Sequence, residues 1–276
     1  MSIYEAVFVR RSVRRFQMNP VRPDILDGVR RFIRSIPPLD TASRVEFEIY
    51  DCLNASDEVV GHEEAVKQIP NVRLTQKEKI RGLWKVEAPY YLAVYCEEGS
   101  LGARNAGYMA EQAVLYLTSK EIGTCYLGET KVGEAERNGL KRLVVIAFGL
   151  ADGKLHRDSS LAHRLSLAGL CAFKDEPGEQ VKAILKAARL APSSFNSQPW
   201  RFVVYADRIY IFARKGTLPQ TKRLRAIRDF NMGIMLSHIM LAAEEYWMNL
   251  ETVTEEQFLK KAYKNGAYIC TVIFHN

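Results

Sequence analysis

The chain has 276 residues, of which 47% are hydrophobic and 26% charged, and a formal net charge of +7 at pH 7. This length and composition suffice for a large core and exclude a disordered chain or a fold that depends on disulfides. No segment approaches the ~20 consecutive apolar residues that a membrane helix needs. The N-terminus lacks a basic region followed by an apolar core, so we expect no secretion signal, no membrane partner and a cytoplasmic location.

The pattern of apolar and β-branched residues predicts helices and strands along the whole chain. In chain order they are helices at 2–9 and 23–35, strands at 45–51 and 90–96, a helix at 104–122, a strand at 143–149, a helix at 178–190, strands at 201–206 and 208–214, a helix at 224–247 and a strand at 268–274. Nearly continuous apolar runs at 90–95 and 268–274 are typical of strands in a sheet covered on both faces. The pattern therefore favours a layered α+β fold.

Two features of these elements bear on function. Residues 51–84 are of mixed polar character and are interpreted as an insertion of loop and short helices, a candidate lid. The predicted helix 224–247 is apolar over a wide surface, which is typical of a core helix, and His238 on it is interpreted as structural.

The cysteines and the positive charge each have a simple interpretation. The five cysteines are Cys52, Cys96, Cys125, Cys171 and Cys270. Their odd number and the lack of Cys-x-x-Cys spacing predict reduced thiols, with neither disulfides nor a metal site. The basic residues are spread over several clusters outside any helix-turn-helix or RNA-binding motif, so we expect no nucleic-acid partner. A basic nucleic-acid-binding domain stays open as an alternative function, beside the two that are given at the end of this section.

Four arginines lie within residues 10–15, directly after the first predicted helix, with Ser12 among them. Guanidinium groups bind phosphate bidentately and stay charged when partly desolvated. The cluster Arg10, Arg11, Ser12 and Arg14 therefore predicts a segment that binds an anion. The alternative is a solvated basic helix end.

A second polar segment joins the predicted helix 178–190 to the next strand. Pro192 ends the helix, because proline lacks the amide hydrogen and clashes with the preceding turn. Ser193, Ser194 and Asn196 then offer hydroxyl and amide groups before the strand begins at Trp200. We interpret residues 192–198, called the elbow below, as a ligand-binding turn; the alternative is an ordinary helix–strand connection.

Together these two segments resemble the signature segments of the FMN-dependent nitroreductase superfamily. The first is Arg-Arg-Ser-x-Arg at 10–14 followed by Pro20, and the second is Ala-Pro-Ser-Ser-x-Asn-x-Gln-Pro-Trp at 191–200. Residues 105–128 are similar to the family's central helix and the loop after it. The strand 143–149 is similar to the one that precedes the family's basic phosphate contact, for which Arg164 is the nearest candidate.

The resemblance implies a nitroreductase-like layered fold of antiparallel or mixed sheets covered by helices, and an FMN site. Arg10, Ser12 and Arg14 would hold the phosphate and the ring edge, and backbone near Leu127 and Gly128 would approach the flavin N5. The full set implied is Arg10, Arg11, Ser12, Arg14, Leu127, Gly128, Arg164, Pro192, Ser193, Ser194, Asn196 and Gln198. No catalytic side chain and no metal are expected, because the flavin carries the chemistry.

The order of the two segments is unusual for the family, because they lie about 180 residues apart here. The chain therefore reads as an internal pseudo-twofold duplication, with one half at 1–172, containing the insertion, and a shorter half at 173–276. Offsets of 154 for the first helix and strand and 124 for the central helices align the halves. In that alignment the first half has lost the hydroxyl and amide donors of the elbow, so we expect one FMN per chain.

Members of the family that the chain resembles are usually twofold dimers with the flavin at the interface. The resemblance therefore implies a monomer that acts as a pseudo-dimer, with a homodimer as the alternative. The expected reaction passes hydride from NAD(P)H through FMN to a small-molecule electron acceptor, a nitroaromatic, a quinone or a similar compound. Motifs of dinucleotide-fold dehydrogenases, nucleotide hydrolases, zinc hydrolases and serine esterases are absent from the sequence. The alternative function is a flavin sink or sensor without reductase turnover.

Overall fold

The structure is a computed structural model. It describes residues 1–53, 86–128, 130–215, 221–263 and 266–275. All but the first three residues of the predicted insertion at 51–84 lie outside the described residues, so the lid stays a prediction.

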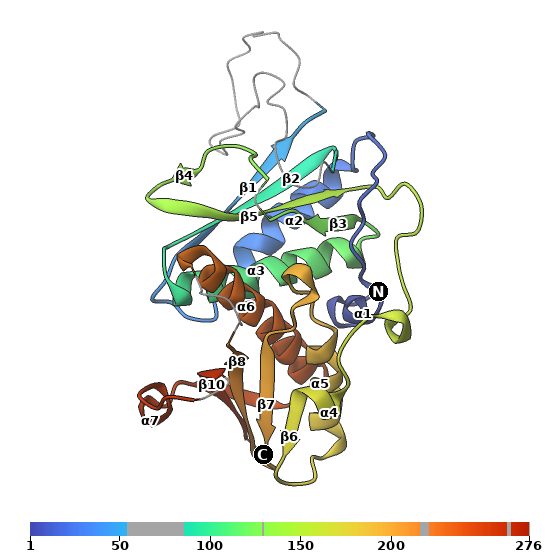
Figure 1. Cartoon of the computed structure of the whole chain (residues 1–276). Helices are drawn as coiled ribbons and strands as arrows, with labels where there is room; N and C mark the ends of the chain where they lie inside the picture. Colours follow the sequence, from blue (N-terminus) through green and yellow to red (C-terminus); the bar gives the residue numbers. More distant parts are fainter. Residues whose placement is uncertain (54–85, 129, 216–220, 264–265, 276) are drawn as a thin grey trace.

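Two five-stranded sheets enclose a layer of helices (Figure 1). The first sheet has the order β1 (Val45–Asp51), β2 (Tyr90–Cys96), β5 (Leu140–Gly149) and β3 (Gly123–Tyr126), with β4 (Glu136–Arg137) also paired to β5. The second has the order β6 (Cys171–Phe173), β7 (Trp200–Val204), β8 (Arg208–Arg214), β10 (Gly266–His275) and β9 (Asn249–Val253). Among the described strands only β6 and β7 pair in parallel, and the other pairs in both sheets are antiparallel. The expected mixed α+β architecture is confirmed.

The helical layer is built around two long helices. The helices are α1 (Ile3–Val9), α2 (Pro23–Ser35), α3 (Ser100–Ser119), α4 (Leu167–Leu170), α5 (Glu179–Leu190), α6 (Lys222–Glu245) and α7 (Glu256–Leu259). Nearly every residue from the second turn of α3 is buried, as is most of the middle of α6. Such burial all round is expected of helices between two sheets. The core of the molecule therefore lies between the sheets, along α3 and α6.

Glycines allow α3 and α6 to cross with their backbones in contact. A Cβ on Gly107 of α3 would lie 2.0 Å from the carbonyl oxygen of Phe230 on α6. A Cβ on Gly233 of α6 would lie 1.9 Å from the carbonyl oxygen of Arg104 on α3. The two contacts are reciprocal, and neither leaves room for a side chain.

The two sheets share one strand order apart from β4 and β6, because β1-β2-β5-β3 matches β7-β8-β10-β9. The sequence offset that aligns the two sheets differs from the one expected in the sequence analysis. Phe47 and Phe202 both pack against the helical layer, which sets the offset at 155; the expected 154 pairs Phe47 with Arg201, on the opposite face. The reciprocal glycines set the helix offset at 126 instead of 124. Strand β6 spans the expected boundary at 172 and joins the second sheet. Duplication and the division into two halves stay predictions.

Candidate functional site

The arginine-rich segment leaves α1 and runs between β3 and the loop after β5. Isolated bridges join Arg10 to His156 and Ser12 to Thr124, and the Val13 amide donates to the Thr124 carbonyl oxygen at 2.9 Å. These contacts place Ser12 beside β3, the strand that leads directly to Leu127 and Gly128. The structure therefore brings two of the predicted segments to one place.

Two guanidinium groups lie near each other at the start of this segment, Arg10 buried and Arg157 half-buried. Arg10 is only 4% exposed, and its Nη1 has no hydrogen-bond partner within the described part of the chain. The Arg157 amide donates to the Val9 carbonyl oxygen at 2.9 Å, and its Nε is likewise buried and unpartnered among the described residues. Burial, followed by the charges of Arg10 and Arg11, lowers the pKa of Arg157. Unused donors of two neighbouring cations fit an anionic group.

The other residues of the segment are more open. Arg11 and Ser12 are half-buried and Arg14 is exposed. Arg14 lies on the side of the segment near Cys125: burial raises the pKa of that thiol, and the charges of Arg14 and Arg10 act in the opposite direction. All five cysteines are free.

Arg164 clamps the elbow instead of standing free. Its Nε donates to the Ala191 carbonyl oxygen at 3.1 Å, its Nη2 to the Leu190 carbonyl oxygen at 3.3 Å and its Nη1 to Asn196 Oδ1 at 2.8 Å. A further bond reaches the His163 carbonyl oxygen, so four of the five guanidinium hydrogens are used. Burial, followed by the charges of Arg157 and Arg10, lowers the pKa of Arg164 to about 10.

The elbow itself is a compact, hydrogen-bonded turn. The Gln198 amide donates to Ser193 Oγ at 2.9 Å, the Leu165 amide donates to Gln198 Oε1 at 2.8 Å, and the Ser194 amide donates to Asn231 Oδ1 of α6 at 3.2 Å. Pro192 is buried at the end of α5. These bonds fix the predicted donors to α6 and to the loop before α4.

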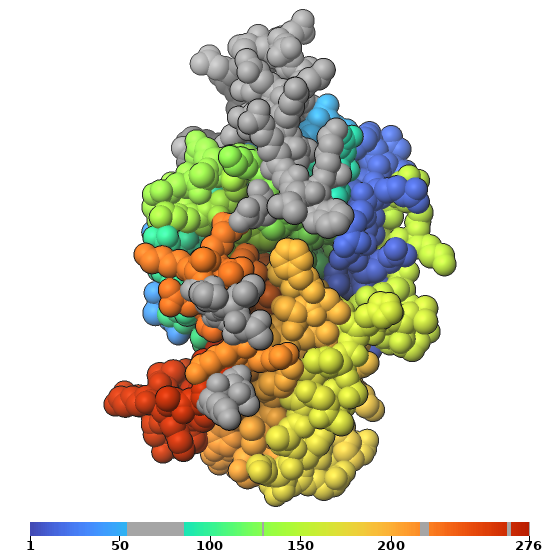
Figure 2. All heavy atoms as spheres, in the orientation of Figure 1, coloured from blue at the N-terminus to red at the C-terminus, as the bar shows by residue number. Residues whose placement is uncertain are grey.

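The elbow backbone is strained. Phe195, Asn196 and Gln198 have φ values of 53°, 52° and 42°, in the left-handed region. Each such residue costs about 1–3 kcal/mol and persists only where its surroundings hold it. Phe195 is 94% exposed, so this strain presents an aromatic ring to solvent. Figure 2 shows the amber surface of this segment bordering the blue surface of the N-terminal segment.

Leu127 and Gly128 follow β3 at the edge of the first sheet. The Leu127 amide donates to the Val145 carbonyl oxygen at 2.9 Å. Gly128 has a φ of 60°, and a Cβ there would meet nothing within 4 Å. The glycine is therefore needed for its backbone conformation and leaves the adjoining space open.

Replacing Arg164 with alanine is expected to destabilise the protein by about 2–3 kcal/mol, because hydrogen bonds from a charged group that hold a strained turn are lost. Chemical denaturation followed by circular dichroism measures this change. Lys186→Ala is the control, because Lys186 is an exposed cation of the neighbouring helix α5. Equal stability of the two variants would show that the clamp contributes nothing.

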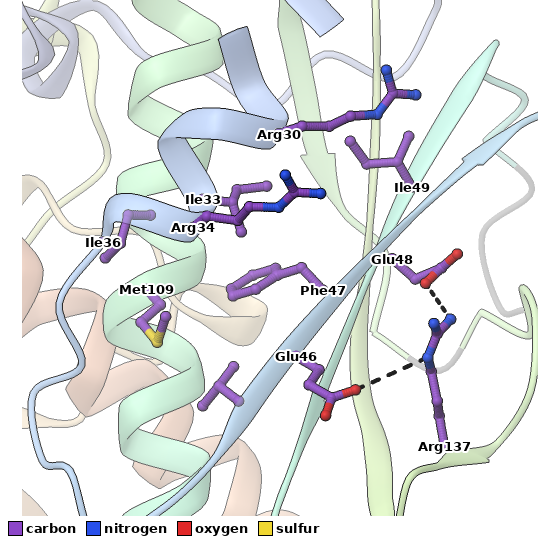
Figure 3. Close-up of a pocket in the computed structure, with 11 residues that line it drawn as sticks. Arg30, Ile33, Arg34, Ile36, Glu46, Phe47, Glu48, Ile49, Met109 and Arg137 are labelled. Atoms are coloured by element: carbon purple, nitrogen blue, oxygen red, sulfur yellow. Dashed lines mark hydrogen bonds and ion pairs between the residues drawn. The ribbon is translucent and has the colours of Figure 1, made fainter. Parts of the chain in front are cut away.

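A hollow elsewhere in the molecule contains none of the predicted site residues (Figure 3). Its volume is about 380 Å³, and it lies along β1, α2 and α3, with Arg34 and Phe47 among its lining residues. In the shared strand order this place on β1 corresponds to the place of β6 on β7. At the offset of 155, Arg34 of the hollow corresponds to Arg189 of α5. Arg189 donates to the Leu165 carbonyl oxygen at 2.7 Å, in the segment that leads to α4 and β6. Among the described residues no strand pairs with this edge of β1, which accounts for the hollow.

Several residues that lie beside Arg10 or the elbow, directly or through one contact, were not assigned to the candidate site in the sequence analysis. They are Arg157, Glu111 of α3, Tyr126 of β3, and Asn231 and His238 of α6. Arg157 stands in a polar loop, where a basic residue is no signal by itself. The other four come from elements far apart in the sequence and meet only in the fold.

No helix in the described residues has the length and apolar character to cross a membrane.

The arrangement of two sheets around a layer of helices is the fold of the nitroreductase class. A family profile described as "Putative TM nitroreductase" matches residues 48–243, which is more than half of the chain. The chain belongs to this nitroreductase family. None of the curated proteins matches it.

Solved structures share the fold at low sequence identity. A "putative nitroreductase" from Thermotoga maritima is 18% identical, with a TM-score of 0.60 over 99% of this chain and 94% of that chain. An FMN-dependent nitroreductase from Clostridium difficile is 13% identical, with a TM-score of 0.41 over 60% of this chain and 98% of that chain. The first of these matches shows that the nitroreductase fold extends over almost the whole chain.

Proposed function

We propose that the protein is an FMN-dependent oxidoreductase of nitroreductase type, which passes hydride from NAD(P)H through the flavin to a nitroaromatic, quinone or similar acceptor. The observation that carries the proposal is the pair of buried, unpartnered donors on Arg10 and Arg157, next to the predicted elbow, in a chain of this family. A phosphate monoester is the anion that such a pair of guanidinium groups suits.

The residues present fit FMN, with one change from the expected roles. Arg10 and Arg157 would hold the phosphate, because each keeps a buried donor unused. Arg164 has one hydrogen left and serves to hold the elbow. When bound, FMN would supply the hydride and electron transfer, while the protein binds and orients the reactants.

Positioning of the other groups follows from the contacts of the elbow and of β3. Ser12 lies beside Thr124, and Gly128 leaves an open space after the same strand. The exposed ring of Phe195 offers an aromatic surface for a planar reactant. Because Arg164, Arg10 and the elbow meet within one chain, these contacts support a flavin site that needs no second copy.

Titration of the purified protein with FMN, followed by flavin fluorescence, is expected to give one FMN per chain. Anaerobic addition of NADPH or NADH to the complex should then bleach the flavin absorbance, and a nitroaromatic or a quinone should restore it. Absence of FMN binding would contradict the proposal. Binding without reduction by either nucleotide would identify the flavin sink or sensor instead.

A further inference from the structure

A carboxylic acid is buried directly behind Arg10. Glu111 of α3 is 0% exposed, and its Oε2 accepts a hydrogen bond from the Tyr126 hydroxyl at 2.7 Å. Its Oε1 lies 3.0 Å from His238 Nε2 and 3.9 Å from Arg10 Nε. The acid therefore faces a phenol, an imidazole and a guanidinium at once, and Arg164 lies close enough for Glu111 to raise its pKa.

The surroundings of His238 determine where its protons are. His238 Nδ1 lies 2.9 Å from the carbonyl oxygen of Ala187, and a carbonyl can only accept. Nδ1 therefore carries a hydrogen. A second proton must lie between Nε2 and Glu111 Oε1, because two lone pairs cannot face each other at 3.0 Å.

Because this proton is shared, Glu111 and His238 together present no net charge to Arg10. If the proton is on His238, an imidazolium stands beside a carboxylate; if it is on Glu111, both groups are neutral. The Glu111–His238 pair has no net charge in either arrangement. Without His238, an ionised Glu111 would be the nearest counter-ion of Arg10 in a site of low dielectric.

We propose that His238 is a positioning residue for anion binding: by sharing a proton with Glu111, it prevents that carboxylate from neutralising Arg10. The positive charges of Arg10, Arg157 and Arg164 then stay available to the anion. The proposal rests on the proposed function in one respect, that the anion is the phosphate of FMN. It assigns a role in the site to a residue of α6 that the sequence analysis interprets as structural.

A double-mutant cycle tests this role. His238→Asn removes the group that faces Glu111, while the asparagine amide can still donate to Ala187. The variant is expected to bind FMN about tenfold more weakly, within the range of coupling between contacting residues. In the double variant E111Q/H238N no carboxylate remains, so FMN affinity should return to within about threefold of the wild-type value. A merely structural role predicts no such rescue.

Glu111→Gln alone provides an independent check if H238N does not fold. It removes the acid from behind Arg10, so it should bind FMN at least as tightly as the wild type. A tenfold loss of FMN affinity in E111Q, or an unchanged affinity in a folded H238N, overturns the proposal while the proposed function stands.

Inorganic phosphate separates the two proposals. Phosphate is expected to raise the thermal midpoint of the wild type and of E111Q/H238N, and to raise that of H238N less. If this pattern appears in a protein that does not bind FMN, the proposed function fails and the role of His238 holds. If phosphate stabilises all three proteins equally, the role of His238 is overturned.

Discussion

Gly233→Ala is expected to lower the thermal midpoint by about 10 °C or to prevent folding. The added methyl group would lie 1.9 Å from the carbonyl oxygen of Arg104, and a backbone atom cannot move aside as a flexible side chain can. Relief requires α3 and α6 to separate, and overpacking of this kind costs about 3 kcal/mol or more. At about 3 °C per kcal/mol for a chain of this size, the expected shift follows.

Helix propensity acts against this expectation, which makes the test stringent. Alanine stabilises a helix interior by about 1 kcal/mol relative to glycine, so without the clash the variant would gain stability. Gly169→Ala in α4 is the matched control, because its Cβ would lie 3.5 Å from Ser166 Oγ, an ordinary contact. Calorimetry measures both. Thermal midpoints that agree between G233A and G169A would show that the helices do not cross through Gly233.

The crossing also bears on the site. Glu111 lies one turn beyond Gly107 on α3, and Asn231 and His238 flank Gly233 on α6. The contact between Glu111 and His238 depends on the distance between these helices. Separating the helices is therefore expected to weaken the proposed flavin site together with the fold.

The sequence predicts the long elements well, because each carries enough residues to show a period. The bounds expected for the helix 23–35 and for the strands 45–51, 90–96 and 208–214 agree with α2, β1, β2 and β8. The strands β3, β4, β6 and β9 were not predicted. They have two to five residues each, too few for an alternation to stand out, and their pairing partners lie far away in the chain.

Because sequence patterns are local, some parts of the candidate site could be predicted and others could not. The elbow could be predicted because its helix stop, polar donors and following strand are contiguous. Arg10 could be predicted because four arginines stand together. The pairing of Glu111 with His238 spans 127 residues, and the proximity of Arg157 to Arg10 depends on the path of the loop after β5. These contacts join residues that are far apart in the sequence, so no local sequence pattern predicts them and only the fold reveals them.

Arg10→Ala is expected to weaken FMN binding by about 100-fold, the effect of losing a charge-assisted contact of roughly 2–3 kcal/mol. The side chain is buried with an unused donor and stands beside Arg157, so no exposed cation of the same segment can replace it. Fluorescence titration at fixed ionic strength measures the affinity. Arg15→Ala is the matched control, because it removes the same charge from an exposed position five residues away.

The comparison separates a specific contact from a general positive field. Long-range attraction depends on net charge and is screened by salt, so it would weaken binding similarly in R10A and R15A, and less so as salt increases. A bound phosphate at Arg10 predicts a large loss in R10A that persists at high salt and almost none in R15A. Equal, salt-sensitive losses would place the phosphate elsewhere. In the R10A background Glu111 has no Arg10 charge to neutralise, so E111Q in that background is expected to leave FMN affinity unchanged; this result would make Arg10 the link between the Glu111–His238 pair and the bound phosphate.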